Sequence, residues 1–391
     1  MLVFAWIAAL STTGCTLIER DSTDRDPSVV APDSGDSAAP FDTAWNETPY
    51  YPSSFEELGD PCADIGPIYS LYFPREGQGW VGCGNGAGLH QSQDDGASFE
   101  EVLPGNNLYV FDLREDREGR LMVCGHAYAG KREGALLIRQ DDPDTWTDLL
   151  FYGKNADQDN AVYISNCGQV AQDSFGRLVV FSNTIGDLTT SSNNGQSWTK
   201  EERYWEDDNL EEGGYAANQV MRLESTSQGF VGSGSNIAEP PMFFKPSTHP
   251  DAEFWHMNRE EISQRHIGEA WALATPDDGE TWVLGGRDQE IGASASGFLF
   301  VGASQEWTSI PLGPEIDIVR DVDFSADGKL GLAVGDRYPP TAKGGFVLVT
   351  LDAGRTWMEM DVDIPADLQR VELQGDKFWI GGNGYFAGGQ L

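Results

Sequence analysis

The sequence predicts an all-β protein, a seven-bladed β-propeller built from four-stranded antiparallel blades. Three observations support this prediction. The 391 residues include 46 Gly and 12 Trp, a composition typical of short strands joined by tight turns. No long amphipathic helical pattern interrupts the chain. A hairpin pattern also recurs: an alternating strand, a polar turn that usually contains Gly, and a bulky apolar strand that ends in small residues.

The hairpin recurs seven times at intervals of 41 to 57 residues. A repeat of about 50 residues is long enough for four short strands, which make one propeller blade. The second strands of these hairpins end at Gly84, Gly125, Ser182, Gly234, Gly286, Gly335 and Gly382.

A second motif follows the hairpins by one strand. It has the form S/T-x-D-x-G-x-T/S-W and is well preserved in Ser92–Phe99, Ser191–Trp198 and Thr350–Trp357, with weaker copies in Arg139–Trp146 and Ser247–Phe254. The Asp and Ser/Thr side chains can bond the backbone amides of a tight turn and Gly supplies a positive φ, so we predict a structural role. The residues with this role are Ser92, Asp94, Gly96, Phe99, Asp141, Trp146, Ser191, Asn193, Gly195, Trp198, Thr350, Asp352, Gly354 and Trp357.

The stretch Thr275–Trp282 also fits the motif, but Trp282 falls half a repeat out of phase. We therefore expect it to form the turn between the first and second strands of the fifth blade, with Asp277 exposed and making few buried bonds. Asp352, which is in phase, should be held by turn amides between the third and fourth strands of its blade.

The last blade lacks one strand, because only seven residues follow its hairpin. The segment Asp42–Tyr51 imitates the closing Trp and the outer strand of the other blades. We expect it to be the outermost strand of the last blade, so that an N-terminal strand closes the ring and covers two strand edges.

The N-terminus predicts export. Leu2–Leu10 is an apolar run too short to span a membrane, and small residues and Cys15 follow it. The segment resembles a bacterial lipoprotein signal, which implies residues 1–15 as signal peptide and Cys15 as the site of lipid attachment. Residues 16–41, rich in Asp, Ser, Pro and Ala, should form a disordered tether before the propeller, residues 42–391. We expect a lipid-anchored protein outside the cytoplasm, on an outer membrane or cell surface; the alternative is a secreted protein with an ordinary cleaved signal.

The formal net charge of −38 argues against nucleic-acid binding, which depends on Lys and Arg. We expect an acidic, soluble surface and a monomer, with the membrane contacted only through the lipid.

Four cysteines remain after Cys15, and in an exported chain they favour disulfides over metal. Three pairings can form. We favour Cys62–Cys83 and Cys124–Cys167, because the start of a first strand and the end of a second strand meet at one face of a propeller.

Propeller ligands gather at the face that carries the loops between blades and between second and third strands. Arginines there could hold an anionic group through paired hydrogen bonds. The alternative is that each pairs with a neighbouring Asp. The candidate ligand-binding residues are His126, Tyr128, Arg132, Arg287, Asp288, Arg320, Asp336, Arg337, Tyr338 and Arg370.

The repeats resemble those of the Asp-box (BNR-repeat, sialidase-like) propellers. The unit Gly79–Phe99 is similar to repeats of the photosystem II assembly-factor family, whose members are seven-bladed. Sialidases of this superfamily use an arginine triad, and Arg75 in "YFPREG" lies in a hairpin turn rather than in their arginine motif. The resemblance therefore implies the fold and leaves the activity open.

We favour a non-enzymatic binding or scaffold module for a protein or glycan; the alternative is a secreted glycan-active hydrolase. No cofactor is expected, since the five His show no metal-ligand spacing. Ca²⁺ is the alternative, through the acidic loops Asn155–Asn160 and Glu206–Gly214, although neither follows an EF-hand pattern.

Overall fold

In the computed structural model, Asp42–Leu391 forms one compact unit. The described residues are 44–63, 65–103, 108–127, 133–140, 145–150, 167–181, 188–200, 219–227, 229–235, 243–246, 255–256, 267–278, 281–288, 296–303, 306–313, 315–337 and 344–391. Cys15 and the predicted tether lie outside them.

The regular elements in these ranges are β-strands, and they form six hydrogen-bonded sheets. The first three sheets have four strands each. They are β3 (Ile68–Arg75), β4 (Gln78–Cys83), β5 (Leu89–Ser92) and β6 (Glu100–Leu103); β7 (Leu108–Glu115), β8 (Leu121–Ala127), β9 (Glu133–Arg139) and β10 (Trp146–Asp148); and β11 (Gln169–Gln172), β12 (Leu178–Phe181), β13 (Leu188–Ser191) and β14 (Thr199–Lys200).

The fourth sheet has eight strands, the fifth has five and the sixth has four. They are β15 (Gln219–Thr226), β16 (Gly229–Ser235), β17 (Phe243–Pro246), β18 (Trp255–His256), β19 (Ile267–Ala274), β20 (Trp282–Asp288), β21 (Ser296–Ala303) and β22 (Glu306–Ile310); β23 (Ile316–Phe324), β24 (Gly331–Arg337), β25 (Gly345–Thr350) and β26 (Thr356–Met360) with β1 (Ala44–Tyr50); and β27 (Leu368–Gln374), β28 (Lys377–Gly382) and β29 (Phe386–Gln390) with β2 (Ser54–Glu57).

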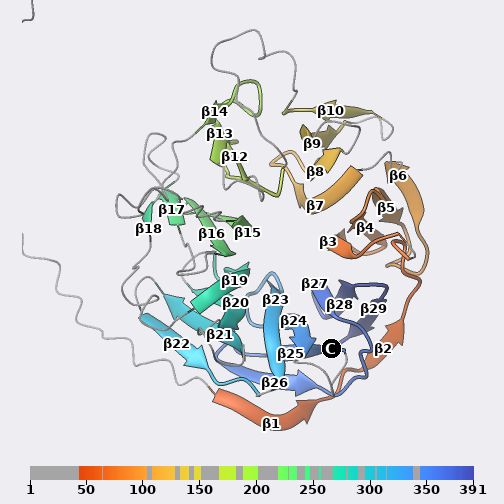
Figure 1. Ribbon diagram of the computed structural model, residues 1–391, viewed down its shortest axis with the longest axis vertical. Coiled ribbons are helices and arrows are strands. Elements are labelled where there is room, and N and C mark those ends of the chain that lie inside the picture. The colour runs from red at the N-terminus through yellow and green to blue at the C-terminus, as the bar shows by residue number, and fades with distance from the viewer. Residues whose placement is uncertain are drawn as a thin grey trace, which may run out of the picture. The chain divides into compact units, whose positions relative to one another are not determined.

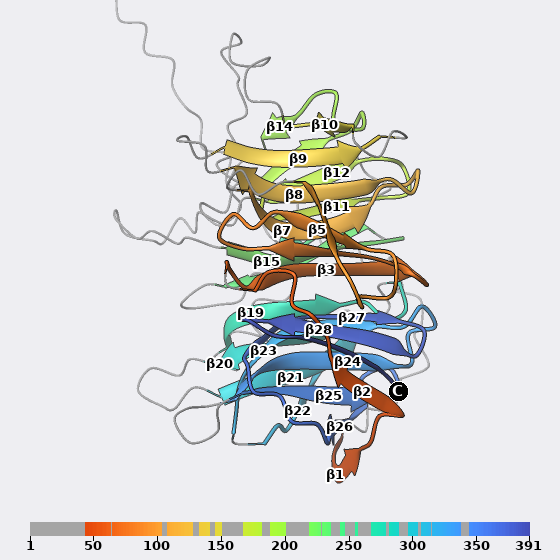
Figure 2. The ribbon, with the colours of Figure 1, turned by 90° about the vertical axis from the view of Figure 1, so that its right-hand side faces the viewer.

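The sheets are arranged radially around one axis, which makes the fold an all-β propeller (Figure 1). In the side view the strands of the different sheets run in roughly the same direction (Figure 2). The first strand of each antiparallel run lies next to the axis, and the last lies at the periphery (Figure 1).

The sequence predicted seven four-stranded sheets, whereas the structure has six sheets, one of them eight-stranded. The difference comes from a single register pair, Ser235 with Glu269, which joins β16 to β19. Without that pair the eight strands would be two four-stranded antiparallel runs, β15–β18 and β19–β22.

The N-terminal strands differ from the prediction. The segment predicted to complete the last sheet, Asp42–Tyr51, contains β1, which instead pairs in parallel with β26 of the preceding sheet. Trp45 lies opposite Trp357 there. The segment that resembles an outer strand therefore forms a fifth strand, outside β26, which is already the outer strand of its sheet. The fourth place in the last sheet is taken by β2, antiparallel to β29, and Phe55 of β2 stacks on Phe378 at 6.2 Å.

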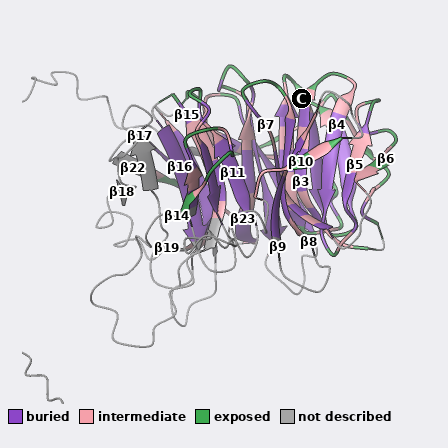
Figure 3. Cartoon of the chain, turned by 90° about the horizontal axis from the view of Figure 1, so that it is seen from above, coloured by how far each residue is buried: buried purple, intermediate pink, exposed green. Residues whose placement is uncertain are grey.

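The core consists of apolar side chains packed between neighbouring sheets. Buried residues follow the strands, and exposed residues concentrate at the turns (Figure 3). Phe73 of the first sheet stacks on Trp379 of the last, with ring centroids 4.0 Å apart, so aromatic packing joins the two ends of the ring.

The turns at Ser92, Ser191 and Thr350 share one hydrogen-bond pattern. In the third of them, the Thr350 hydroxyl accepts from the Gly354 amide at 2.9 Å and donates to Asp352 at 2.9 Å. Asp352 accepts from the Thr356 amide at 2.8 Å and the Thr356 hydroxyl at 2.7 Å. Gly354 has a φ of 83°, as the motif requires, and Trp357 is fully buried. Asp141, in one of the weaker copies, lies outside the described residues.

The out-of-phase stretch Thr275–Trp282 begins directly after β19, as expected, and its last residue, Trp282, is the first residue of β20. Asp277 is exposed, but it accepts from both the amide and the hydroxyl of Thr281, as Asp352 does from Thr356. Both of these bonds are exposed, so the expectation that Asp277 is exposed and makes few buried bonds is confirmed, although the turn uses the same hydrogen bonds as the turn of Asp352.

Two disulfides are present, Cys62–Cys83 and Cys124–Cys167. They are the pairs favoured from the sequence. All four cysteines are fully buried, and the second bond joins β8 of one sheet to Cys167, two residues before β11 of the next.

We predict that Asp352→Ala lowers the free energy of unfolding by about 1–3 kcal/mol, because it removes the acceptor of the Thr356 amide. The matched control is Asp352→Asn. At the equivalent position of another turn, Asn193 bonds the Ser197 amide at 2.9 Å and the Ser197 hydroxyl at 2.8 Å, so Asn fits this turn. Urea unfolding checks both variants; equal losses in the two would contradict the assigned role of the carboxylate position.

Candidate functional site

The innermost strands share a β-bulge at one place. In β3, β7, β15, β19, β23 and β27 the pairing with the next strand skips one residue, and the extra residue is left without a cross-strand partner. We call these six extra residues the axial rim: Tyr69, Phe111, Met221, Trp271, Arg320 and Gln369.

Each axial-rim residue is half-buried, although the residues on both sides of it are mostly buried. A bulge turns its extra side chain away from the regular alternation, and here the strands carrying it surround one axis (Figure 1). The rim thus places three aromatic rings, one Met, one Arg and one Gln at the same level around the axis.

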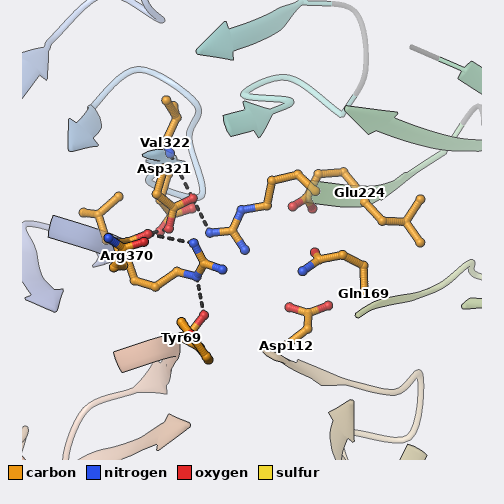
Figure 4. A network of polar contacts seen from close by, with 12 residues as sticks. Tyr69, Asp112, Gln169, Glu224, Asp321, Val322 and Arg370 are labelled. Carbon is orange, nitrogen blue, oxygen red and sulfur yellow. Dashed lines mark hydrogen bonds and ion pairs between the residues drawn. The ribbon is translucent and has the colours of Figure 1, made fainter. Parts of the chain in front are cut away.

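The residue after each bulge is buried and polar in most of the strands. Asp112 of β7 accepts from the Val170 amide of β11 at 3.0 Å, and Asp321 of β23 accepts from the Val371 amide of β27 at 3.0 Å. Figure 4 shows these carboxylates meeting side chains from several strands at the axis. Each acid therefore satisfies an amide on the open inner edge of the next sheet.

A second layer, two residues further along the strands, repeats this arrangement. Asp323 accepts from the Leu373 amide at 2.7 Å. Glu372 of the last sheet accepts from the Phe73 amide of the first sheet at 3.1 Å. Carboxylates thus link the second sheet to the third, the fifth to the sixth, and the sixth to the first.

Arginines balance these acids across the axis. Arg114 of β7 pairs with Glu224 of β15 at 2.7 Å, past the intervening sheet of β11. Arg222 of β15 forms an ion pair with Asp321 of β23, past β19. Figure 4 shows Glu224 and Asp321 on opposite sides of this network. These ion pairs join side chains of non-adjacent sheets across the axis.

Arg370 lies beside the first layer (Figure 4) and donates to the carbonyl oxygens of Tyr69 and Gln369. Burial, together with the neighbouring Arg222, lowers the pKa of Arg370 to about 9. The guanidinium remains a cation at neutral pH.

Three of the candidate arginines, Arg287, Arg320 and Arg337, are bonded to acids. Arg287 pairs with Asp317 at 2.9 Å, and Arg320 pairs with Asp336 at 2.9 Å. Arg337 pairs with Glu359. These partners are not the sequence neighbours considered beforehand, because β20, β23 and β24 bring more distant acids together.

Arg320 also lies over the ring of Trp271, 4.5 Å from its centroid, and the Trp271 indole N–H donates to Glu269 at 2.9 Å. Burial raises the pKa of Asp336, and the nearby Asp367 and Asp317 raise it further. This part of the rim therefore combines the Trp271 ring with an arginine whose charge is balanced by Asp336, and further acids lie nearby.

His126, the candidate residue on β8, belongs to an aromatic cluster. Its ring stacks on Tyr109 at 5.2 Å, Tyr109 lies 6.1 Å from Phe111, and Phe111 lies 5.6 Å from Tyr69. All four are half-buried. Of the other candidates, Tyr128, Arg132 and Tyr338 lie outside the described residues, as does the side chain of Asp288.

Within the described part of the chain, no group of three or more His, Cys, Asp or Glu could hold a metal ion. Both loops considered for Ca²⁺ lie outside that part. The described residues also contain no helix that is long and apolar enough to cross a membrane.

Sequence reasoning named Arg320 but missed the rest of the axial rim. The rim residues occupy the same position when the inner strands are aligned. The bulged residue is the second one in each of the stretches Ile68–Tyr72, Val110–Arg114, Ala270–Ala274 and Val319–Asp323. Aligning the inner strands residue by residue would have found it, whereas examining the loops could not.

No family model and no curated protein matches this chain. Solved structures match its fold. "YCF48 bound to D1 peptide" is 16% identical with a TM-score of 0.58, over 88% of this chain and 99% of that one. YCF48 from Cyanidioschyzon merolae is 13% identical with a TM-score of 0.59, over 86% and 99%. The GH74 xyloglucanase from Xanthomonas campestris is 13% identical with a TM-score of 0.57, over 85% and 52%. At these identities the similarity shows the propeller fold alone.

The axial acids predict a pH dependence of stability. Burial raises the pKa of Asp323 to about 7, and burial also raises the pKa of Glu372, with the Asp323 carboxylate adding to the effect. In the unfolded chain such acids titrate near pH 4. The folded state thus binds more protons between about pH 4 and pH 7, so its stability falls as the pH rises through that window.

We predict that Asp323→Asn flattens this decline between about pH 4 and pH 7, because the amide oxygen still accepts from the Leu373 amide while no charge forms. Melting temperatures measured across the window check it, with Asp376→Asn in a surface turn as the control. A variant with the same pH dependence as the wild type would contradict the assignment of the proton to this pair.

Proposed function

We propose that this protein is a non-enzymatic binding propeller whose axial rim holds an extended segment of a partner protein. The single observation that carries the proposal is the set of six bulged, half-exposed side chains at one end of the axis, where aromatic and Met residues dominate. Aromatic and Met side chains are favoured in interface anchors. A propeller of similar fold has been solved with a bound peptide, which fits this use of the architecture.

The proposal includes a finer description of the ring. We count seven blades, taking β15–β18 and β19–β22 as separate blades that share one register pair, with β2 as the N-terminal strand that closes the ring. The turn bonds of Ser92, Ser191 and Thr350 support assignment to the Asp-box propellers.

We further propose that the protein is exported and anchored by a lipid on Cys15, with the propeller held outside the cytoplasm as a monomer. The two disulfides support an oxidising compartment. A glycan is a second ligand class in this proposal, since aromatic rings also stack on sugars.

The alternative, a glycan-active hydrolase, has one supporting observation: a xyloglucanase shares the fold. Glycoside hydrolysis requires two carboxylates that reach the substrate. The axial carboxylates with a raised pKa, Asp323 and Glu372, instead accept bonds from backbone amides. Purified protein should therefore show no turnover of aryl glycosides or polysaccharides; activity abolished by one carboxylate substitution would establish the hydrolase instead.

For the binding site, we predict that Phe111→Ala and Trp271→Ala each abolish capture of a partner from native membranes, while Tyr51→Ala does not. Tyr51 is an equally aromatic residue, 67% exposed, outside the axial rim. Quantitative mass spectrometry of captured proteins checks this. Partners retained by both rim variants, with melting temperatures unchanged, would contradict an axial site.

For the anchor, we predict that the protein expressed in a bacterium incorporates labelled palmitate and that Cys15→Ser loses the label. A mature protein that begins at another residue would contradict the lipoprotein assignment.

A further inference from the structure

We infer that the ligand of the axial rim is a positively charged peptide segment, whose basic side chains contact the rim aromatics and the exposed aspartates at the same end of the propeller. This inference rests on the proposed peptide-binding function and names the chemistry of the partner.

The first argument is the charge left at this end of the axis after internal pairing. Arg287, Arg320 and Arg337 are each bonded to an acid, and the charge of Arg370 is offset by the neighbouring Asp321 and Asp112, so these arginines offer little net positive charge. Asp361, Asp363 and Asp367, in the connection from β26 to β27, are all exposed, and within the described part of the chain no cation pairs with them. The excess charge of the described surface here is therefore negative.

Among these aspartates, Asp367 belongs to the same electrostatic environment as the rim. Asp367 directly precedes β27, and its charge acts on Asp336, the partner of the rim residue Arg320. Asp363 and Glu57 both act on Tyr385. A ligand at the axis therefore lies in the field of a carboxylate that pairs with no cation among the described residues.

The second argument is the type of side chain on the rim. Tyr69, Phe111 and Trp271 are half-exposed aromatic rings, and an aromatic face attracts a cation. The protein itself uses this contact, because the Arg320 guanidinium lies over Trp271. The Lys or Arg side chain of a ligand could contact the remaining rings in the same way.

The third argument is the net charge of the whole chain. A formal net charge of −38 repels an anionic or acidic partner and steers a cationic one toward the protein. Charge complementarity therefore selects a basic segment over an acidic one, and the rim aromatics select a peptide that presents long, flexible cationic side chains.

The test uses the mature protein and short fluorescein-labelled peptides that share their Pro, Gly and Phe positions and carry only Lys, only Gln or only Glu at the variable positions. Fluorescence anisotropy should show saturable binding of the Lys peptide, at least about tenfold tighter than the Gln peptide, and none of the Glu peptide. The affinity for the Lys peptide should fall as the ionic strength rises.

Two sets of variants locate the contacts. Phe111→Leu, which keeps an apolar side chain but removes the ring, should weaken Lys-peptide binding, and Phe111→Tyr should not. The double variant Asp363→Asn/Asp367→Asn should weaken it and reduce its salt dependence. The double variant Glu47→Gln/Glu100→Gln removes the same charge from exposed residues of β1 and β6 and should leave binding nearly unchanged.

The outcomes separate this inference from the function beneath it. If the Gln or Glu peptide binds as tightly as the Lys peptide and Phe111→Leu weakens that binding, the rim binds peptides but the inference of a basic ligand is overturned. If Phe111→Leu and the aspartate variant leave Lys-peptide binding unchanged, or if no peptide binds, both the inference and the peptide-binding function at the axial rim are overturned.

Discussion

The bond between an axial carboxylate and a backbone amide of the next sheet is the interaction on which the structure depends. The innermost strand of a propeller sheet has one edge without a partner strand, and its amides need acceptors in a place with little water. Asp112, Asp321, Asp323 and Glu372 supply them from the preceding sheet. One side chain thereby satisfies an amide and links two sheets, and Glu372 does so at the junction of the last sheet with the first.

This solution places negative charge in the interior, and the rest of the axial network follows from that. Buried charges are costly unless they are paired and hydrogen-bonded. Arg114 and Arg222 reach across the axis to Glu224 and Asp321, and burial raises the pKa of Asp323, so that this acid holds a proton more tightly. Because these groups bond one another, they are unavailable to a ligand. In the proposed function, contact with a partner falls to the bulged residues beside them, whose side chains are only half-buried.

Much of the fold could be predicted from the sequence because its signals are local. The hairpin period, the phase of the turn motif and the disulfide pairs each depend on residues close in sequence or on strand ends known to meet. The roles of β1 and β2 could not be predicted in this way: Trp45 matches a closing Trp in type, and only the three-dimensional register shows that it lies beside Trp357. The union of β16 and β19 depends on a single residue pair, for which no sequence pattern exists. The site was missed for a related reason, since a bulge is a property of pairing between two strands.

The most direct test of the central role of the carboxylate–amide bonds is residue-resolved hydrogen exchange of the inner-strand amides. The Val371 amide lies on a strand edge with no partner strand, yet it should exchange slowly in the wild type because Asp321 accepts from it. Asp321→Ala should accelerate exchange at Val371 while leaving the Val347 amide, within the paired strand β25, protected. Rapid exchange at Val371 in the wild type, or equal acceleration at both amides, would contradict the account.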